Sequence, residues 1–458
     1  MTQVSSIILA AGKGTRMKSQ LPKVLHGLCG RPMLSHVICA ASDAGVNRNI
    51  VVIGHGAEMV REKITGSNME WVDQLEQLGT GHAVMQAESS LVDFKGDVII
   101  LCGDTPLITS DTLTKLMQKH ASEGNAGTVL TAIMDDPTGY GRVVRDLDES
   151  VQEIVEHKDA SKEQLQIKEI NTGIYCFNSA KLFSYLQEVS PANAQGEYYL
   201  TDVLAILKRE GQKIGATVVA DPLETMGINN RVQLAEAEKI MRLRILHRLM
   251  MDGVTIVDPG NTYVDKDVII GADSVVYPGT IIEGKCSLGT ECEIGPYSRL
   301  RDVEVGQRVT IQNSIILEST VADEVNIGPF AYIRPGTVLK ESVKVGDFVE
   351  IKKSVVGKGS KVPHLSYVGD AEIGENVNIG AGTITCNYDG SSKSKTIIGN
   401  NAFVGSNTNF VAPVEVGENA VIGAGSTVTK SVPDGSLCVE RSKQIVYPEW
   451  VARKNKKK

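Results

Sequence analysis

A glycine-rich turn near the amino terminus carries the first residues that could do chemistry. Residues 9–17 read Leu-Ala-Ala-Gly-Lys-Gly-Thr-Arg-Met and follow an apolar segment that we expect to be a strand. Glycines at the carboxyl end of a strand offer backbone N–H groups to a phosphate. Arg16 and Lys23, the latter directly after Pro22, add the cations that a triphosphate requires. The pattern favours a phosphate site, with a plain surface turn as the alternative.

The same turn excludes the two common nucleotide-binding motifs. A dinucleotide fingerprint would have glycine or alanine where Met17 stands. A P-loop would have Gly-Lys-Ser/Thr after four spacer residues, and this sequence does not. Any nucleotide site here must therefore be of another type.

Two further polar segments are expected at the same edge of the sheet. The predicted strand Val98–Leu101 ends in Cys102-Gly103-Asp104, which places a carboxylate where Mg²⁺ could bind together with substrate phosphates. Gln74 begins a polar turn that extends to residue 81, and its amide could read a base edge because it both donates and accepts. A helix cap for Asp104 and a simple tight turn for residues 74–81 stay open as alternatives.

The elements that would position these residues follow from the hydrophobic pattern. Apolar runs at 7–11, 50–54 and 98–103 alternate with amphipathic stretches, which predicts an α/β layer order with a largely parallel sheet. From Arg231 to Met251 the apolar residues recur every three or four positions, and Gly253 closes the run, so a linker helix is expected. We predict three parts: a domain at 1–230, a linker helix at 231–252 and a second domain at 253–458.

Beyond Tyr263 the apolar residues recur every six positions, over 270–300, 327–351 and 398–428. Glycine often follows the apolar position, and a small or β-branched residue often precedes it by two. A helix cannot carry this repeat, whereas in a parallel β-helix each hexad forms one short strand and a bend. Three hexads, 18 residues, would form one triangular coil.

Two cations lie one predicted coil apart on the outside of this β-helix. Arg334 follows inward Ile333, and Lys352 follows inward Ile351, so the two side chains should stack at roughly 4.8 Å. Like charges at that spacing repel unless an anion lies between them, which favours a bound phosphate. Solvent-screened surface cations are the alternative.

The hexad phase breaks between residues 351 and 373, and again between 379 and 398. Such breaks are expected at functional or strained places. The first break contains His364, which would ordinarily be a solvated loop histidine, but its position beside the two cations makes it a candidate site residue.

Composition limits the classes of protein and partner. The chain has 458 residues, 42% hydrophobic and 22% charged, which predicts a globular protein of more than one domain. The 47 basic and 55 acidic residues give a net charge of −8, which argues against nucleic acid as a partner, and the one basic run, Lys454 with residues 456–458, is terminal. We find no membrane span and no secretory pattern at the amino end. Eight cysteines without metal-ligand spacing favour reduced thiols and a cytoplasmic location.

The motif at residues 9–17, with Pro22 and Lys23, resembles the signature of sugar-1-phosphate nucleotidylyltransferases. Together with the hexapeptide repeat and Gln195-Gly196-Glu197-Tyr198-Tyr199, the whole chain resembles the family of bifunctional N-acetylglucosamine-1-phosphate uridyltransferase/glucosamine-1-phosphate acetyltransferases. The resemblance implies a Rossmann-like nucleotidyltransferase domain, a linker helix and a left-handed β-helix. It also implies acetylation of glucosamine-1-phosphate by acetyl-CoA, followed by transfer of UMP from UTP, which gives UDP-N-acetylglucosamine for cell-wall synthesis.

For the uridyl site, the resemblance implies that Arg16 and Lys23 act on the phosphates and that Asp104 and Asn229 hold Mg²⁺. The residues implied to contact UTP or UDP-N-acetylglucosamine are Leu9, Ala10, Ala11, Gly12, Lys23, Gln74, Gly79, Thr80, Cys102, Gly103, Asp104, Gly141, Glu156, Asn171 and Asn229. Of these, Gly141, Glu156 and Asn171 would face the acetamido sugar. At position 102 a tyrosine also occurs in the family, so only the backbone of Cys102 is expected to matter.

For the acetyl site, the resemblance implies that His364 is the general base, a task that imidazole suits at neutral pH. Arg334, Lys352, Tyr367 and Asn378 would hold the sugar phosphate. Acetyl-CoA would contact Ala381, Asn387, Tyr388, Ser406, Ala424 and Arg441, of which Ser406 and Ala424 lie one coil apart. In this family three chains associate and complete each other's acetyl sites, so a homotrimer is implied.

Two other interpretations stay open. One is a nucleotidyltransferase for a sugar phosphate whose β-helix is only structural, against which His364, Arg334 and Lys352 argue. The other is a noncatalytic assembly subunit, which would not need Arg16, Lys23 and Asp104 together.

Overall fold

The computed structural model describes residues 3–66, 68–147 and 149–455. The chain divides into two compact units, residues 1–241 and 242–458. Residues 456–458 of the terminal basic run lie outside the described residues. Among the described residues, no helix has both the length and the hydrophobicity of a membrane span.

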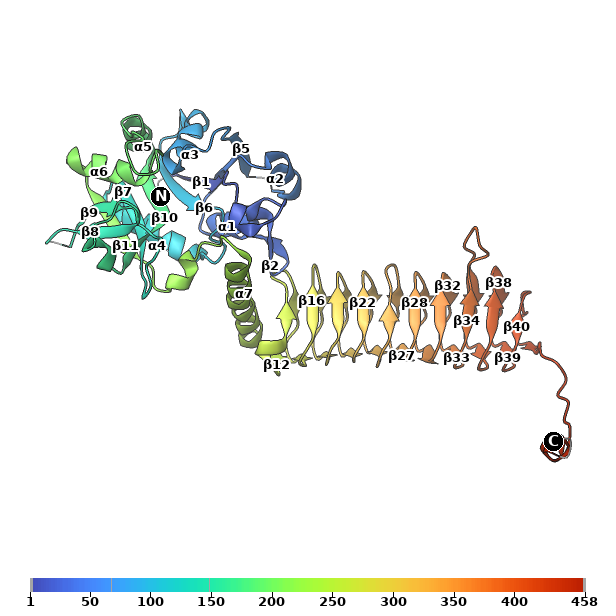
Figure 1. The fold of residues 1–458 in the computed structure, drawn as a ribbon. Helices are drawn as coiled ribbons and strands as arrows, with labels where there is room; N and C mark the ends of the chain where they lie inside the picture. Colours follow the sequence, from blue (N-terminus) through green and yellow to red (C-terminus); the bar gives the residue numbers. More distant parts are fainter. Residues whose placement is uncertain (1–2, 67, 148, 456–458) are drawn as a thin grey trace. The chain divides into compact units, whose positions relative to one another are not determined.

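A mixed sheet forms the centre of the first unit, with the strand order β11-β7-β10-β6-β1-β4-β5 (Figure 1). Its strands are β1 (Val4–Ala10), β4 (Arg48–Ile53), β5 (Met69–Asp73), β6 (Asp97–Cys102), β7 (Gly127–Ile133), β10 (Glu169–Asn178) and β11 (Ile214–Val218). β8 (Arg142–Arg145) and β9 (Val151–Val155) extend the sheet from β10, and β2 (Gly27–Leu28) pairs with β3 (Arg31–Pro32). β6, β1, β4 and β5 run parallel, as predicted, whereas β10 runs antiparallel to both of its neighbours.

Helices cover both faces of this sheet because alternate residues of each central strand point to opposite sides. On one face Ile7, Ile50 and Ile100 pack against α3 (Thr80–Gln86), α5 (Ser179–Leu186) and α6 (Thr201–Arg209). On the other face Ile8 and Val51 pack against α1 (Met33–Asp43) and α4 (Ser110–Glu123). A further helix, α2 (Ala57–Lys63), follows β4.

The parallel strands place the predicted motifs at one edge of the sheet. β1, β4, β5 and β6 are hydrogen-bonded neighbours, and their carboxyl ends lie at Ala10, Ile53, Asp73 and Cys102. Loops that follow neighbouring parallel strands emerge at the same edge. The glycine turn, the Gln74 turn and Asp104 therefore lie together, as the sequence predicted.

A helix, α7 (Arg231–Met251), is present where the sequence predicted the linker. Among its apolar residues, Ala237, Met241, Ile245 and Leu249 are buried. The helix contains the boundary between the two compact units, which falls after Met241.

The second unit is a parallel β-helix of three sheets (Figure 1). The first sheet consists of β12 (Thr255–Ile256), β15 (Val275–Val276), β18 (Glu293–Ile294), β21 (Thr310–Ile311), β24 (Asn326–Ile327), β27 (Lys344–Asp347), β30 (Lys361–His364), β33 (Asn378–Ile379), β36 (Phe403–Val404), β39 (Val421–Ile422) and β41 (Leu437–Cys438). The second consists of β13 (Tyr263–Val264), β16 (Ile281–Glu283), β19 (Arg299–Arg301), β22 (Ile315–Leu317), β25 (Tyr332–Ile333), β28 (Glu350–Lys352), β31 (Tyr367–Gly369), β34 (Ile384–Cys386), β37 (Asn409–Val411) and β40 (Thr427–Val428). The third consists of β14 (Ile269–Ile270), β17 (Ser287–Leu288), β20 (Glu304–Val305), β23 (Thr320–Val321), β26 (Val338–Leu339), β29 (Val355–Val356), β32 (Ala371–Ile373), β35 (Thr396–Ile398) and β38 (Val414–Val416). A short helix, α8 (Trp450–Asn455), follows the last coil.

The coils confirm the predicted inward positions but vary in length. Ile333 and Ile351 are fully buried and lie opposite each other, 18 positions apart, as predicted. Ile351 opposes Val368, 17 positions later. The pair Ile373 and Ile398 is separated by 25 positions, because the residues after β34 form a loop outside the coil. The breaks in the hexad phase are therefore one shortened coil and one inserted loop.

Two candidate active sites

Four predicted residues of the first site form one polar cluster. The Lys23 ammonium lies 2.5 Å from Asp104 Oδ2 and donates to Asn229 Oδ1 at 3.1 Å. The Arg16 guanidinium donates to the same Asn229 oxygen at 2.9 Å. The cluster thus joins two cations to one carboxylate and one amide oxygen, from loops that are far apart in the sequence.

The glycine turn shapes this cluster by allowing a close approach. Gly14 has a φ of +59°, and a Cβ there would lie 2.6 Å from Lys23 Cβ. Lys23 itself begins a 3₁₀ turn that ends at Leu25, directly after Pro22. Gly14 therefore lets the turn pack directly against the residue that carries the ammonium group.

Two adjoining cavities extend from the cluster along the edge of the sheet. One, of about 290 Å³, is lined by Lys23, Asp104, Gln74 and the strand end at Leu9. The other, of about 220 Å³, is lined by Gly141, Glu156 and Asn171. Both share Leu9, Thr80 and Cys102, and the first also contains the predicted Ala10, Ala11, Gly12 and Gly79. The structure therefore lines these cavities with most of the residues predicted for the uridyl site.

The second cavity contains a carboxyl group in an unusual environment. Burial raises the pKa of Glu156, and the neighbouring carboxylate of Asp159 adds to this effect. Asn171 is held through its Oδ1, which accepts hydrogen bonds from the backbone N–H of Gly173 at 3.1 Å and from the hydroxyl of Tyr175 at 2.9 Å. The side chain of Asn171 is thereby oriented before any ligand binds.

Cys102 lines both cavities, but its thiol is unsuited to nucleophilic chemistry. Burial, followed by the charge of Asp104, raises the pKa of Cys102 to about 12. Its Sγ lies 3.5 Å from the carbonyl oxygen of Gly173. A protonated thiol is a poor nucleophile, which agrees with the prediction that only the backbone at this position matters.

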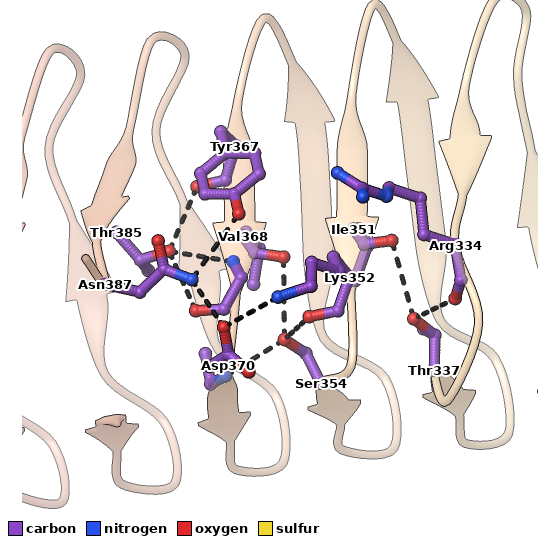
Figure 2. A network of polar contacts seen from close by, with 12 residues as sticks. Arg334, Thr337, Ile351, Lys352, Ser354, Tyr367, Val368, Asp370, Thr385 and Asn387 are labelled. Carbon is purple, nitrogen blue, oxygen red and sulfur yellow. Dashed lines mark hydrogen bonds and ion pairs between the residues drawn. The ribbon is translucent and has the colours of Figure 1, made fainter. Parts of the chain in front are cut away.

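The second unit gathers a network of polar side chains on the face formed by β28, β31 and β34 (Figure 2). Lys352 Nζ lies 3.0 Å from Asp370 Oδ2, and the amide of Asn387 donates to the same oxygen at 2.5 Å. That amide nitrogen is also 3.4 Å from the hydroxyl of Tyr367. A Cβ at Gly369 would lie 2.3 Å from this hydroxyl, so the bare backbone makes room for the tyrosine.

The interpretation of Arg334 and Lys352 as uncompensated like charges is wrong. Arg334 donates to Glu350 Oε1 at 2.7 Å, and Lys352 is paired with Asp370, so each cation has a carboxylate on the neighbouring coil. The coil spacing placed the two cations one coil apart, but neither acidic partner was predicted. Their repulsion therefore does not require an anion.

A third cation joins this network from the inserted loop. Its contact with the like-charged ammonium group of Lys352 lowers the pKa of Lys393. Lys393 was not predicted as a site residue. The one relevant signal in the sequence is that Lys393 lies in the second segment that breaks the hexad phase.

His364 ends β30 and is paired with a carboxylate of the preceding coil. Its Nδ1 lies 2.6 Å from Asp347 Oδ1, and this hydrogen bond lowers the pKa of Asp347. The two residues are register partners in neighbouring strands, 17 positions apart. The contact fixes the orientation of the ring, which is 56% exposed and leaves Nε2 as the nitrogen available to a substrate.

Residues predicted for the coenzyme form a row along the same edge of the prism. Gly382 N–H donates to the His364 carbonyl, Asn407 N–H to that of Ala381, and Gly425 N–H to that of Ser406. Arg441 then donates to the carbonyl of Ala424 at 2.8 Å. His364, Ala381, Ser406 and Ala424 therefore occupy the same edge of consecutive coils.

Two predicted residues lie apart from these clusters. Asn378 lies in β33, on the first sheet of the β-helix, where it opposes Lys361 and Phe403. Tyr388 is exposed on the inserted loop, and its hydroxyl donates to the carbonyl of Gly390 at 2.6 Å.

Two family models match the chain, one in each compact unit. A nucleotidyl transferase family model matches residues 5–221, and a model of six bacterial transferase hexapeptide repeats matches residues 395–430. A solved structure of UDP-glucose pyrophosphorylase complexed with UDP-glucose gives a TM-score of 0.45 at 18% identity, covers 53% of this chain and 100% of that chain, and is too remote to bear on function.

Three curated relatives, each named bifunctional protein GlmU, match along the entire length. The protein from Heliobacterium modesticaldum is 56% identical over 456 residues, which cover 100% of this chain and 99% of the relative. That from Pelotomaculum thermopropionicum is 57% identical, with 99% of both chains covered, and that from Geobacillus sp. strain WCH70 is 51% identical, with both chains covered fully. These relatives confirm the predicted resemblance, and the three parallel sheets are those of the predicted hexapeptide β-helix. The chain is a member of the bifunctional GlmU family.

Proposed function

We propose that the chain makes UDP-N-acetylglucosamine in two steps, each in its own site. The β-helix site acetylates glucosamine-1-phosphate with acetyl-CoA, and the sheet site then transfers UMP from UTP to the product and releases pyrophosphate. The observation that carries the proposal is that each compact unit contains a separate cluster of charged groups, Lys23 with Asp104 in one and His364 with Asp347 in the other. We assign the uridyl activity to residues 1–230 and the acetyl activity to residues 253–458, joined by a linker at 231–252.

In the uridyl site, the protein's task is to align the phosphates and neutralise their charge. The oxygen of N-acetylglucosamine-1-phosphate is ionised at neutral pH, so it attacks the α-phosphorus of UTP without a general base, and the bond to pyrophosphate breaks. Arg16 and Lys23 bring two cations to the charge that develops on the phosphates. Glu156 and Asn171, in the adjoining cavity, would bind the acetamido sugar.

The oxygens of this cluster also fit a magnesium ion. Asp104 Oδ2 and Asn229 Oδ1 both reach the Lys23 ammonium, so two hard oxygen ligands converge on one point. Mg²⁺ is usually held by one or two such oxygens together with substrate phosphates. Asp104 and Asn229 would hold the ion, which would neutralise phosphate charge when bound.

In the acetyl site, His364 Nε2 accepts a proton from the amino group of glucosamine-1-phosphate as that nitrogen attacks the thioester carbon. The new C–N bond forms, the C–S bond breaks, and coenzyme A leaves as a thiol after protonation. Asp347 supports this role because it binds Nδ1 and leaves the opposite nitrogen as the acceptor. Arg334, Lys352, Tyr367 and Lys393 would contact the sugar phosphate from the second sheet and the inserted loop, and Asn378 would contact it from the first sheet.

The row that continues from His364 supports the assignment of acetyl-CoA. Ala381, Ser406 and Ala424 lie on consecutive coils, and Arg441 donates to the carbonyl of Ala424. Asn387 and Tyr388, in the segment after β34, would contact the same cosubstrate. An extended cosubstrate could lie along such a row. We further propose a homotrimer in the cytoplasm, in which neighbouring chains complete each acetyl site.

Two separate assays test the proposal with the full chain. UTP, Mg²⁺ and N-acetylglucosamine-1-phosphate should yield pyrophosphate, and acetyl-CoA with glucosamine-1-phosphate should yield free coenzyme A thiol. A chain that performs only the first reaction would instead be a nucleotidyltransferase on a structural β-helix. The pairing of His364 with Asp347 argues against that alternative, because a purely structural coil does not need an oriented imidazole.

A further inference from the structure

Two groups that the proposed acetyl site assigns to different substrates share one carboxylate oxygen (Figure 2). Asp370 directly follows β31, and its Oδ2 lies 3.0 Å from Lys352 Nζ and 2.5 Å from the amide nitrogen of Asn387. Lys352 is among the residues proposed for the sugar phosphate, and Asn387 is among those proposed for acetyl-CoA. Asp370 itself belongs to neither set.

The carboxylate of Asp370 is ionised and largely sheltered from solvent. Its side chain is 14% exposed, and that of Lys352 is 16% exposed. Burial alone would raise the pKa of Asp370, but the hydrogen bonds from Lys352 and Asn387 lower it. An ionised carboxylate can only accept, so the end of the Asn387 amide that faces it must be the nitrogen. Asp370 therefore fixes which end of this amide is left for a ligand.

The other neighbours of these two side chains cannot replace Asp370. The Asn387 nitrogen also lies 3.4 Å from the Tyr367 hydroxyl, but a hydroxyl can donate or accept and so does not select one end of an amide. The Lys352 ammonium also contacts that of Lys393, which has the same charge and repels it. Among the described residues, the carboxylate of Asp370 is thus the group that holds both side chains in place.

Building on the proposed acetyl transfer, we infer that Asp370 is a positioning residue that orients one binding group for each of the two substrates. It holds the Lys352 ammonium against the repulsion of Lys393, so that both cations are in place for the sugar phosphate. Through the same oxygen it holds the Asn387 nitrogen, which leaves the amide oxygen for acetyl-CoA. Asp370 acts through these two side chains and touches neither substrate.

The backbone at Asp370 offers both a conservative variant and a matched control. Asp370 has a φ of +49°, in the left-handed region that Asp and Asn adopt more readily than other residues with a side chain. Asp370→Asn should therefore fold without added strain. Asp302 also directly follows a strand of the second sheet, β19, and has a φ of +54°. Its side chain is 47% exposed and accepts from the backbone N–H of Lys285, away from the proposed site residues.

Two substitutions at Asp370 separate its two contacts. Asp370→Ala removes both, whereas Asp370→Asn removes the charge that holds Lys352 but can still accept from Asn387. A hydrogen bond to a charged group is worth roughly tenfold or more in affinity. We therefore expect Asp370→Ala to raise the KM for glucosamine-1-phosphate and the KM for acetyl-CoA about tenfold each. Asp370→Asn should raise the first by the same factor and leave the second within about twofold of the wild type.

The effect on acetyl-CoA should depend on Asn387. In an Asn387→Ala background, Asp370→Ala should cause no further rise in the KM for acetyl-CoA, while it should still raise that for glucosamine-1-phosphate. The control, Asp302→Ala, should leave both KM values unchanged. A merely structural role of Asp370 would not produce this separation between the two substrates.

Several results would overturn the inference. They are a change in only one KM or in neither for Asp370→Ala, equal rises of both for Asp370→Asn, equal losses in Asp302→Ala, and additive effects on acetyl-CoA with Asn387→Ala. Uridyl transfer and the Tm of each variant report on folding, and if Asp370→Ala does not fold, the two KM values of Asp370→Asn decide.

The same assays distinguish a failure of this inference from a failure of the proposed function. A wild-type chain that releases no coenzyme A thiol from acetyl-CoA and glucosamine-1-phosphate would overturn the proposed acetyl transfer itself. An active wild-type chain whose two KM values are unaffected by Asp370→Ala would overturn only the positioning role of Asp370.

Discussion

Substitution of Asp104 by asparagine should separate the two activities of the chain. The change keeps the size of the side chain and removes one negative charge from the cluster with Lys23. In the wild-type chain these side chains are only 22% and 14% exposed, and their charged atoms are 2.5 Å apart. Solvent therefore screens this ion pair only weakly. The loss of the negative charge should for this reason have a large effect on the activity of the site.

The size of the effect follows from the contacts that disappear. A hydrogen bond between charged groups contributes about 1.5–3 kcal/mol, which corresponds to roughly 10- to 150-fold in rate. The variant also lacks the carboxylate oxygen that would bind Mg²⁺. We expect kcat/KM for uridyl transfer to fall by at least about 100-fold and acetyl transfer to stay within about twofold.

The assay is pyrophosphate release from UTP, run beside coenzyme A release on the same preparation. The matched control is Asp111→Asn, because Asp111 and Lys115 form an ion pair of similar length, 2.6 Å, but are 73% and 62% exposed. Exposed pairs contribute little, so this variant should retain both activities. The reasoning fails if Asp104→Asn keeps normal uridyl transfer, or if both activities fall together.

Four other substitutions probe three separate features. His364→Ala should lower the rate of acetyl transfer by about 10²- to 10⁴-fold and leave uridyl transfer unchanged. Asp347→Asn should lower acetyl transfer less, because Asp347 only orients the imidazole ring. Coenzyme A release measures both effects. Burial, aided by Asp159, raises the pKa of Glu156, so the folded chain favours its protonated form and loses stability as the pH rises through that raised pKa. Glu156→Gln should therefore gain in Tm over the wild type as the pH rises above the ordinary pKa of a glutamate, while the KM for the sugar phosphate rises; a constant Tm difference would contradict this account. Because the pKa of Cys102 is about 12, its thiol should resist iodoacetamide at neutral pH, and Cys102→Ala should retain uridyl transfer; rapid alkylation in a peptide-mass analysis would show otherwise.

Much of the fold could be predicted because its repeats are simple. The period of six placed Ile333 and Ile351 inside the β-helix, and the helical period set both ends of the linker helix at Arg231 and Met251. The meeting of Lys23 with Asp104 also followed from a general rule, since both lie beyond the carboxyl ends of neighbouring parallel strands.

The contacts that tune the sites could not be predicted in the same way. Asp347 escaped notice because its coil has 17 residues, so a strict 18-residue spacing points to the neighbour of His364 rather than to His364 itself. The carboxylate partner of Lys352 is different, because Asp370 lies 18 positions later and could have been predicted from the same coil spacing. The contact of Asn387 with Asp370 depends on how the inserted loop folds against the coils, which periodicity does not encode.

The row of coils that begins at His364 has a regular spacing along the axis of the β-helix. Each coil advances the chain by one strand spacing, about 4.8 Å, so Ala424, three coils beyond His364, lies about 14 Å along the axis. If the proposed cosubstrate binds along this row, the length available to it changes in steps of one coil, because each strand pairs with strands of the neighbouring coils. A related protein with a longer or shorter acyl donor could change the length of this row by gaining or losing one coil, while the histidine at the start of the row stays in place.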